Sequence, residues 1–306
     1  MDLKQFRYFV AIAEEEHFGR AAKRLRIVQP ALSRQVKLLE EELGILLFER
    51  LPRGVVLTEA GRVFLQEIKD VDRHILRAVG LAKATAQGNY GTLRLSLIES
   101  AAWHGMIPNS LRLYRERFPE VQVSLSTMPT AMQLDFLRSQ QTDAAIVYNP
   151  QNIGDLVSIE LAQQHVVLAM PEDCPLIENP EISISDLANY TLIGFQRQGS
   201  PKLYDDLIAA LSGVAFLPNF ISEPINETEM LALVSAGAGL AFANASQQWR
   251  KPHGVVFAPV RDLDVRMSLQ LVHRREHIAP TLSNFLETLH EYLGHRSKDI
   301  LERDEL

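Results

Sequence analysis

A short stretch of the chain gathers polar and basic side chains at the spacing of one helix face. Gln29 and Arg34 can each form paired hydrogen bonds with the edge of a DNA base, and Ser33 can bond a base or a phosphate. Lys37 carries a charge suited to phosphate oxygens. Pro30 fits only in the first turn of a helix, where its missing N–H costs nothing. The stretch predicts a helix that presents its first two turns to double-stranded DNA, although a plain solvent-facing helix is the alternative.

The residues before this stretch predict the elements that would position it. Apolar side chains recur at helical spacing over residues 3–14 and again over 18–25, and the third helix runs over 29–42. A three-residue turn separates the second and third helices, which is the pattern of a helix-turn-helix. Ala21 and Ala22 support this reading, because small side chains let two helices cross closely.

Two short strands follow the third helix. Residues 47–50 and 55–57 flank a Pro-Arg-Gly turn and predict a hairpin, the wing of a winged helix-turn-helix over residues 1–58. The wing carries Arg53 at its tip. We expect Arg53 and Arg24 to contact the DNA backbone together with Lys37, because phosphate contacts require charge and not sequence.

The charge distribution agrees with this domain structure. The net charge of the chain is −7, yet residues 1–90 hold 15 Lys and Arg against 12 Asp and Glu. Within residues 17–58 there are eight basic and four acidic side chains. A basic N-terminal module is therefore attached to an acidic body, as expected of a nucleic-acid-binding domain fused to a second function.

A long helix is predicted over residues 59–87, followed by a Gly-Asn-Tyr-Gly hinge at 88–91. Its apolar stripe alternates spacings of four and three, which is the seam of a coiled coil. We expect this helix to pair with a second copy and form a homodimer, although packing as a core helix of its own domain is the alternative. The predicted dimerisation residues are Phe64, Ile68, Val71, Ile75, Ala78 and Ala82.

The remaining chain alternates predicted strands and helices from residue 92 onwards. This alternation indicates an α/β domain over 92–295, with parallel strands and helices on both faces, and its length suits two lobes. The charged tail 296–306 is expected to fray.

Several function classes find little support in the composition. No apolar run approaches the length of a membrane span, and the N-terminus lacks the pattern of a signal peptide, so we expect a cytoplasmic protein without a membrane partner. Cys174 is the only cysteine, which excludes an intramolecular disulfide and a thiolate metal cluster. We expect no metal, no cofactor and no enzymatic activity, since no nucleophile elbow or Walker loop is present. An enzyme using Ser100 and some of the nine histidines, and an architectural DNA binder without a ligand, are the competing hypotheses.

The sequence resembles the LysR-type transcriptional regulators. The resemblance begins with LKQFRYFVAIAEE, is densest in AAKRLRIVQPALSRQVKLLEEELGILLFER followed by VVLTEAG, and continues through GTLRLSL, IPNSLRLYRERFPEVQV and QTDAAIV. It departs from the family at His17, Gly19 and Val28, where Ser or Thr is common. Val28 cannot cap the third helix with a side-chain oxygen.

The resemblance implies an effector domain similar to type 2 periplasmic binding proteins. Lobe I would comprise 92–162 and 268–295, and lobe II 163–267, with a ligand between the lobes. Residues 165–168 and 267–271 would form the two crossover strands. The resemblance also implies that two dimers assemble into a homotetramer, and that ligand-driven closure changes DNA bending and contact with RNA polymerase.

Candidate ligand-binding residues lie at predicted helix starts that face this cleft. Ser100 and Thr130 follow strands and open helices, and we expect their hydroxyls and nearby N–H groups to attract an anion. Glu99 adjoins Ser100 and fits an anion poorly unless it points away. Two more helix starts occur at Ser200–Pro201 and at Asn226.

The stretches STMPTAMQ and GSPK resemble the branch of the family that senses aromatic-catabolism intermediates such as muconates. This resemblance implies a small organic acid as the effector. Trp103, Tyr148 and Phe195 are the aromatic residues that we expect to wall its pocket.

Overall fold

The computed structural model describes residues 1–52, 54–102, 105–216, 218–224 and 226–303. The chain forms two compact units, Met1–Lys83 and Ala84–Leu306. No described helix is both long and apolar enough to cross a membrane. The described part of the chain also contains no cluster of His, Cys, Asp and Glu that could hold a metal ion, and Cys174 is buried as a free thiol.

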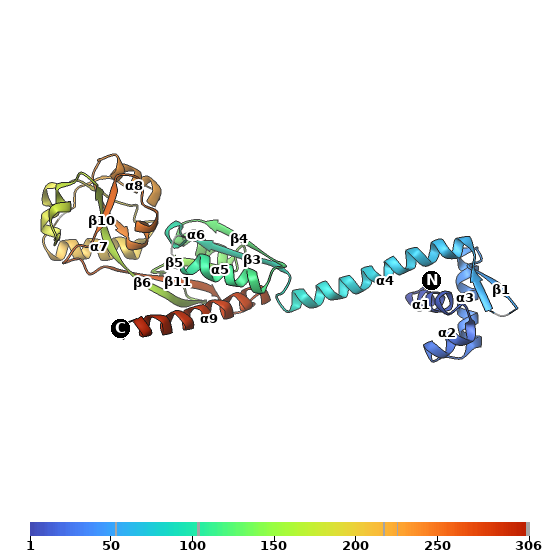
Figure 1. Cartoon of the computed structure of the whole chain (residues 1–306). Coiled ribbons are helices and arrows are strands. Elements are labelled where there is room, and N and C mark those ends of the chain that lie inside the picture. The colour runs from blue at the N-terminus through green and yellow to red at the C-terminus, as the bar shows by residue number, and fades with distance from the viewer. Residues whose placement is uncertain (53, 103–104, 217, 225, 304–306) are drawn as a thin grey trace. The chain divides into compact units, whose positions relative to one another are not determined.

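The first unit is a winged helix-turn-helix (Figure 1). Asp2 caps the first helix by accepting a hydrogen bond from the backbone of Gln5, whose side chain accepts in turn from the Asp2 backbone. Glu16 and Arg26 end the first two helices in the left-handed conformation. The elements are α1 (Leu3–Glu15), α2 (Phe18–Leu25), α3 (Gln29–Leu43), β1 (Phe48–Leu51), β2 (Gly54–Leu57) and α4 (Glu59–Ala86).

An aromatic and aliphatic core holds these helices together. Phe9 is fully buried and packs against Phe48 and Phe64, with ring centroids 5.2 Å and 5.1 Å away. Ala21 and Ala22 are buried in the same cluster. This agrees with the close helix crossing predicted from their small side chains.

The wing is an antiparallel hairpin in which Phe48 pairs with Leu57 and Leu51 pairs with Gly54. Gly54 has φ +144°, and a Cβ there would lie 2.7 Å from the carbonyl oxygen of Glu16. The tight join between the wing and α1 therefore requires glycine. Arg53, predicted at the wing tip, lies outside the described residues.

The second unit is a two-lobed α/β domain (Figure 1). Its strands follow the order β4-β3-β5-β11-β6-β9-β7-β8, and β10 pairs with β6. The strands are β3 (Gly91–Leu97), β4 (Val121–Thr127), β5 (Ala144–Tyr148), β6 (Leu156–Pro171), β7 (Leu192–Ile193), β8 (Phe220–Ser222), β9 (Leu240–Asn244), β10 (Val255–Ala258) and β11 (Arg266–Arg274). The helices are η1 (Glu99–Ala102), α5 (Met106–Arg117), α6 (Thr130–Arg138), η2 (Pro175–Glu178), η3 (Ile184–Asn189), α7 (Pro201–Gly213), α8 (Glu227–Ser235), η4 (Ala245–Arg250) and α9 (Pro280–Arg303).

Two long strands, β6 and β11, connect the lobes. They pair antiparallel from Arg266 opposite His165 to Arg274 opposite Leu156, with a register shift between Leu269 and Gln270. The first part of β6 belongs to lobe I, and its last part pairs with β9 and β10 in lobe II. The predicted crossovers at 165–168 and 267–271 lie within these strands.

The expectation of parallel strands was wrong for part of this domain. β3 is parallel to β4 and β5, and β7 is parallel to β8 and β9. β11 and β6, however, run antiparallel to their neighbours. A chain that leaves lobe I and later returns to it must supply two strands of opposite direction, so the sheet is mixed.

Lobe I is closed by α5 and α9. Tyr114 is fully buried between them, where its ring lies edge-on to Phe285 and its hydroxyl donates to the carbonyl oxygen of Thr281 at 2.9 Å. Burial raises the pKa of Tyr114 to about 12, so it stays a neutral donor. Gly88 approaches the start of α9 so closely that a Cβ would lie 2.4 Å from the carbonyl oxygen of Pro280. A larger side chain at position 88 would therefore clash with the start of α9.

One element boundary differs from the predictions. The helix that we expected to open at Ser100 is instead the short 3₁₀ helix η1, and α5 begins only at Met106. α9 spans Pro280–Arg303, and the expectation that the tail frays from residue 296 stays a prediction. Helical propensity alone does not identify where a 3₁₀ turn replaces the first turn of an α-helix.

Candidate DNA-binding surface and ligand pocket

The start of α3 forms an exposed polar surface. Gln29, Pro30 and Arg34 are exposed and Ser33 is half-buried, while Leu32 beneath them is fully buried. Val28 precedes the helix without a side-chain cap, so the first N–H groups of α3 have no cap from that residue. Free N–H groups at a helix start attract phosphate. This arrangement suits a helix that inserts its first turns into the major groove.

The predicted backbone cations differ in how far neighbouring acids neutralise them. Arg24 pairs with Glu14 at 2.8 Å and Glu15 at 3.5 Å, and these carboxylates raise its pKa. Lys37 lies 3.4 Å from Glu41 on the same helix. Arg34 has no ion pair among the described residues, so its guanidinium is more available for DNA than those of Arg24 and Lys37.

Two of the other exposed cations of this unit, Arg26 and Arg50, lie close to the predicted DNA-binding residues and were not among them. Arg26 ends α2 in the left-handed conformation directly before α3, and Arg50 lies in the wing with its guanidinium 5.7 Å from the centre of the Phe18 ring. The basic excess of residues 17–58 was the available signal for both. Periodicity could not separate them, because neither belongs to the face of α3.

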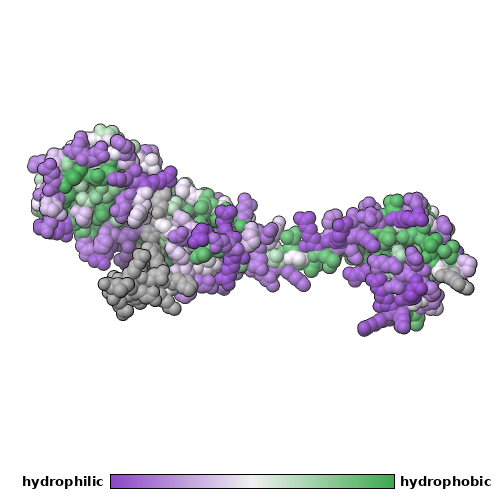
Figure 2. Space-filling model, viewed as in Figure 1, coloured by the Kyte–Doolittle hydropathy of each residue, from purple (hydrophilic) through white to green (hydrophobic). Residues whose placement is uncertain are grey.

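The predicted dimerisation stripe divides into two parts. Phe64 and Ile68 pack within their own unit, where Phe64 contacts Phe6 and Phe9 and only 7% of Ile68 is exposed. Phe64 therefore contributes to the core of its own unit, and its assignment to dimerisation stays a prediction, like that of the rest of the stripe. The four later positions Val71, Ile75, Ala78 and Ala82 are exposed or half-buried. Figure 2 shows apolar surface along α4 among hydrophilic side chains.

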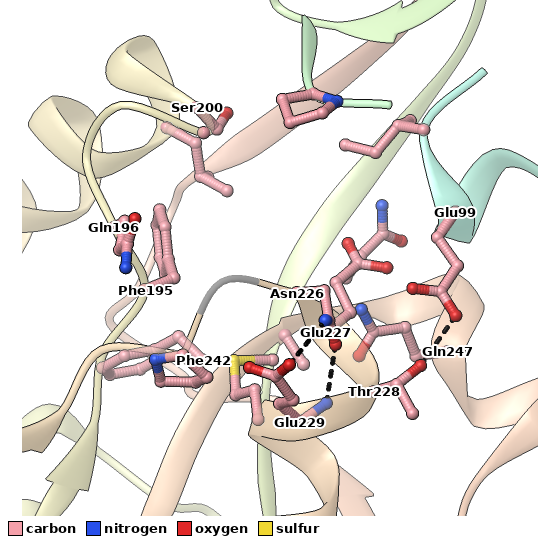
Figure 3. A pocket seen from close by; sticks show the side chains of 18 of the residues that line it. Glu99, Phe195, Gln196, Ser200, Asn226, Glu227, Thr228, Glu229, Phe242 and Gln247 are labelled. Carbon is pink, nitrogen blue, oxygen red and sulfur yellow. Dashed lines mark hydrogen bonds between the residues drawn. The ribbon is translucent and has the colours of Figure 1, made fainter. Parts of the chain in front are cut away.

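A cavity of about 570 Å³ lies between the two lobes of the second unit (Figure 3). Lobe I supplies its wall from the ends of β3 and β4, and lobe II supplies the remainder around α7, α8 and η4. The lining residues are Ile98, Glu99, Thr127, Met128, Pro129, Val166, Phe195, Gln196, Gly199, Ser200, Leu203, Leu207, Pro224, Asn226, Glu227, Thr228, Glu229, Met230, Phe242, Ala243, Asn244, Gln247 and Met267.

One side of this cavity is acidic (Figure 3). Glu99 of lobe I accepts a hydrogen bond from the hydroxyl of Thr228 of lobe II at 2.7 Å, which joins the lobes directly. Glu227 begins α8, and Glu229 is held by the cap residue Asn226 through bonds of 2.8 Å and 2.9 Å. The α8 dipole favours acids at this position.

Glu227 is the most perturbed of these acids. Its Oε2 atom is buried without a hydrogen-bond partner among the described residues. Burial raises the pKa of Glu227 to about 7, the charge of Glu99 adds to this, and the polar groups of Ser100 and Gln247 oppose it. At neutral pH the carboxyl group is therefore poised between its two protonation states.

Two buried amides lie beside the acidic side. Asn244 and Gln247 line the cavity, yet only 3% and 1% of their surfaces are exposed. The Nδ2 of Asn244 and both polar atoms of the Gln247 side chain lack partners within the described structure. Buried amides without partners are costly, so they indicate a group that a bound molecule would satisfy.

The opposite side of the cavity is apolar and aromatic. Phe195 and Gln196 lie across from the acids in Figure 3, and Phe195 packs edge-on to Tyr204 at 5.8 Å. Leu203, Leu207 and Phe242 extend this wall. The cavity thus combines an apolar body with one polar corner, as small-molecule sites usually do.

The predicted effector residues only partly reach this cavity. Glu99, Ser200 and Asn226 line it, and so does Phe195. Four others lie outside the lining, namely Ser100, Thr130, Tyr148 and Pro201. Trp103 lies outside the described residues.

The hydroxyls of Ser100 and Thr130 do not cap helices. Pro129 precedes α6 as its cap residue, and the buried hydroxyls of Ser100 and Thr130 have no hydrogen-bond partner within the described residues. Tyr148 is buried outside the cavity lining, where its hydroxyl donates to Gln164 at 3.2 Å and burial raises its pKa to about 12. It acts as a core residue of β5.

Sequence reasoning missed most of the lobe II lining. Glu227, Asn244 and Gln247 come from a helix start, a strand end and a 3₁₀ helix that carry no shared motif. The signal that pointed to Ser100, a polar residue directly after a buried strand, also existed at Asn244. Gln247 had no such signal, since it reaches the cavity only through the path of η4.

Comparisons with known proteins agree with this architecture. Residues 3–62 match the family "Bacterial regulatory helix-turn-helix protein, lysR family", and residues 86–294 match "LysR substrate binding domain". The chain is 33% identical over 287 residues to the HTH-type transcriptional regulator AlsR of Bacillus subtilis, covering 94% of both proteins. It is also 33% identical over 294 residues to the HTH-type transcriptional regulator IlvR of Caulobacter vibrioides, covering 95% of this chain and 98% of IlvR.

A solved structure extends the comparison to DNA. Full-length CbnR in complex with its target DNA matches with a TM-score of 0.80 and 26% identity, over 96% of this chain and all of CbnR. The matched regions include both the winged helix-turn-helix and the two-lobed domain. The protein is therefore a member of the LysR family of DNA-binding transcriptional regulators, with a C-terminal effector-binding domain.

Proposed function

We propose that this regulator reads its operator with the exposed start of α3 and is controlled by a small molecule bound between the lobes of its second unit. Gln29, Ser33 and Arg34 would contact base edges, and Lys37 with Arg24 and Arg53 would contact phosphates. The bound molecule is sensed and not converted. The protein would act in the cytoplasm, where promoter DNA is.

The observation that supports control by a bound molecule is the set of polar groups in the cavity lining that lack hydrogen-bond partners within the described residues. The amides of Asn244 and Gln247 are buried in a cavity built by both lobes, and they lack partners within the described residues. A ligand that satisfies these groups contacts lobe II, and the lobe I wall lies opposite. Such a ligand would bind the closed arrangement more tightly than the open one, which is the requirement for an allosteric effect.

The assembly that we propose is a homodimer through α4, with two dimers forming a homotetramer. The apolar positions Val71, Ile75, Ala78 and Ala82 follow the coiled-coil spacing, and all of them are exposed except Ile75, which is half-buried. A dimer presents two α3 helices to a two-fold related DNA site. Ligand-driven closure would change the spacing of these pairs, and thereby DNA bending and contact with RNA polymerase.

The organic acid predicted from the sequence is one candidate ligand class. The unpartnered hydroxyls of Ser100 and Thr130 favour it, because both are polar groups near the lobe I wall that a ligand oxygen could satisfy. The charges of the lining oppose it, since Glu99, Glu227 and Glu229 are all carboxylates.

Footprinting on selected DNA would test this function. The purified full chain would select duplexes from a random pool, and the bound site would be mapped with and without metabolites that raise the melting temperature. We expect a two-fold related footprint whose extent changes with at least one such metabolite, and the metabolite should be recovered unchanged by mass spectrometry. A footprint that is indifferent to every stabilising metabolite would refute the proposed control.

A further inference from the structure

The charge of the inter-lobe cavity identifies the class of molecule that it accepts. Its described lining contains three carboxylates, Glu99, Glu227 and Glu229, and no Lys, Arg or His. An anion brought into this cavity would meet carboxylates and no compensating cation. A cation would form ion pairs with these carboxylates.

We propose that the effector carries an amine on an apolar body, with the ammonium group placed against Glu227 and Glu99 and the body against Phe195 and Leu207. The proposal rests on the proposed function, because it names the ligand of that same site. It differs from the organic acid that the sequence predicts.

The acidic corner is built as a site and not as a solvated surface. Gln247 is buried beside Glu227 with both polar side-chain atoms unpartnered within the described residues, and Asn244 is buried with its Nδ2 unpartnered. The Gln247 Oε1 atom and the Glu227 Oε2 atom are acceptors that receive no hydrogen bond from the described part of the chain. A primary ammonium group offers three N–H donors to these two acceptors, while the Nε2 of Gln247 and the Nδ2 of Asn244 are donors that need an acceptor elsewhere on the ligand.

Four helix starts meet the cavity. Those of α6 and α7, at Pro129 and Ser200, carry no side-chain cap and favour an anion, whereas those of α8 and η1 carry acids and favour a cation. The first turn of α8 is already occupied by its own acids, with Asn226 capping and Glu229 bonded to it. In lobe I, η1 is a single 3₁₀ turn, and it begins with Glu99 itself. One turn of 3₁₀ helix offers little positive potential against a full carboxylate.

The pKa of Glu227 follows from the same surroundings. Burial and the nearby charge of Glu99 raise it to about 7. A bound ammonium group would lower that pKa again and stabilise the ionised form. Binding of an ammonium group would therefore shift the Glu227 carboxyl from the protonated to the ionised form.

The test uses sets of probes that share one carbon skeleton and differ only in charge. One set is 2-phenylethylamine, 2-phenylethanol and phenylacetate, and a second replaces the ring with a cyclohexyl group. Calorimetric titration of the full chain should show each amine binding at least tenfold tighter than its alcohol, with the acid weakest. Equal or tighter binding of the acids, or no binding of any amine, would overturn the proposal.

Variants identify where the preference arises. Glu227→Gln should remove the preference for the amine and raise the affinity for the acid, because the amide keeps the size but not the charge. Glu99→Gln should reduce the preference by about threefold, since this carboxylate already accepts a hydrogen bond from Thr228. Glu120→Gln, a matched change at an exposed position away from the cavity, should leave all affinities unchanged.

Footprinting in parallel separates the two proposals. Amines that bind through Glu227 but leave the footprint unchanged would support the ligand class and refute the proposed control. Acids that bind more tightly and change the footprint would refute the ligand class and leave the control intact.

Discussion

The hydroxyl of Thr228 donates a hydrogen bond to the carboxylate of Glu99 at 2.7 Å, and these two residues belong to different lobes. Both also line the cavity. The contact therefore reports on the closure of the lobes, and it involves one of the acids that we expect to bind the ligand. Removing it should loosen closure without removing any charge.

Thr228→Val should lower the free energy of unfolding by about 0.5–1.5 kcal/mol, the usual contribution of one hydrogen bond. Hydrogen exchange at the start of α8 and in η1 should become faster in the variant, because the two lobes separate more often. Thr191→Val is the matched control, since its hydroxyl bonds to Ala238 within lobe II alone. Unchanged exchange in both segments would show that the bond does not hold the lobes.

Glu227→Gln should change how stability depends on pH. The ordinary pKa of 4.5 rises to about 7 in the folded protein. Between these values the folded chain keeps a proton that the unfolded chain has lost, so stability falls as pH rises through this window. The glutamine variant should lack this fall and be more stable than the parent by roughly 1–3 kcal/mol at about pH 8.

Melting temperatures from about pH 5 to about pH 8 would measure this effect. Glu99 and Glu229 also line the cavity near Glu227, while Tyr148 stays neutral in this range because its pKa is about 12. Glu120→Gln is the control and should keep the parent's slope. Parallel curves for parent and Glu227→Gln would contradict the raised pKa.

Arg34→Ala should weaken operator binding by about 1–3 kcal/mol and relax selectivity at one base position, since a paired contact to a base edge would be lost. Arg24→Ala should have a smaller effect, because Glu14 and Glu15 already neutralise that guanidinium. Fluorescence anisotropy against salt, on operator and scrambled duplexes, measures both. A larger loss of operator selectivity in Arg24→Ala would reverse our assignment.

Charges placed in the exposed part of the α4 stripe should separate the dimer. The double variant Val71→Glu with Ile75→Glu puts acids at two positions of the coiled-coil seam, and sedimentation should show monomers. Val63→Glu places the same charge at an exposed position off the stripe and should stay dimeric. Phe64→Ala should instead destabilise the first unit by roughly 2–4 kcal/mol, because its ring packs on Phe9.

The first unit could be predicted from local patterns in the sequence. Each of its helices begins and ends within a few residues of the expectation, since caps, turns and periodicity are local signals. Which residues of the α4 stripe pack within their own unit could not be predicted in the same way. An apolar stripe of helical spacing predicts that this face of the helix packs against something. It does not say whether the partner is the same domain, as for Phe64, or a second chain, as we propose for Val71.

The pocket could be predicted only in part, because its chemistry depends on which residues, distant in the sequence, the fold brings together. Glu99 and Asn226 were recognised at element starts, yet Gln247 reaches the cavity through a 3₁₀ helix that periodicity does not reveal. The acidic residues that lobe II adds to the lining were not predicted, for the same reason. Hydroxyls at two predicted helix starts suggested an anion, whereas the folded chain adds Glu227 to the corner occupied by Glu99.

The path of β6 and β11 makes lobe II one uninterrupted insertion between two paired strands. That single insertion carries Glu227, Asn244, Gln247 and the aromatic wall, while recognition of DNA resides in the first unit. Recombination within the gene could therefore exchange the sensor while preserving the operator. A chimaera that receives this insertion from a relative should answer to the donor's metabolite at the recipient's promoter.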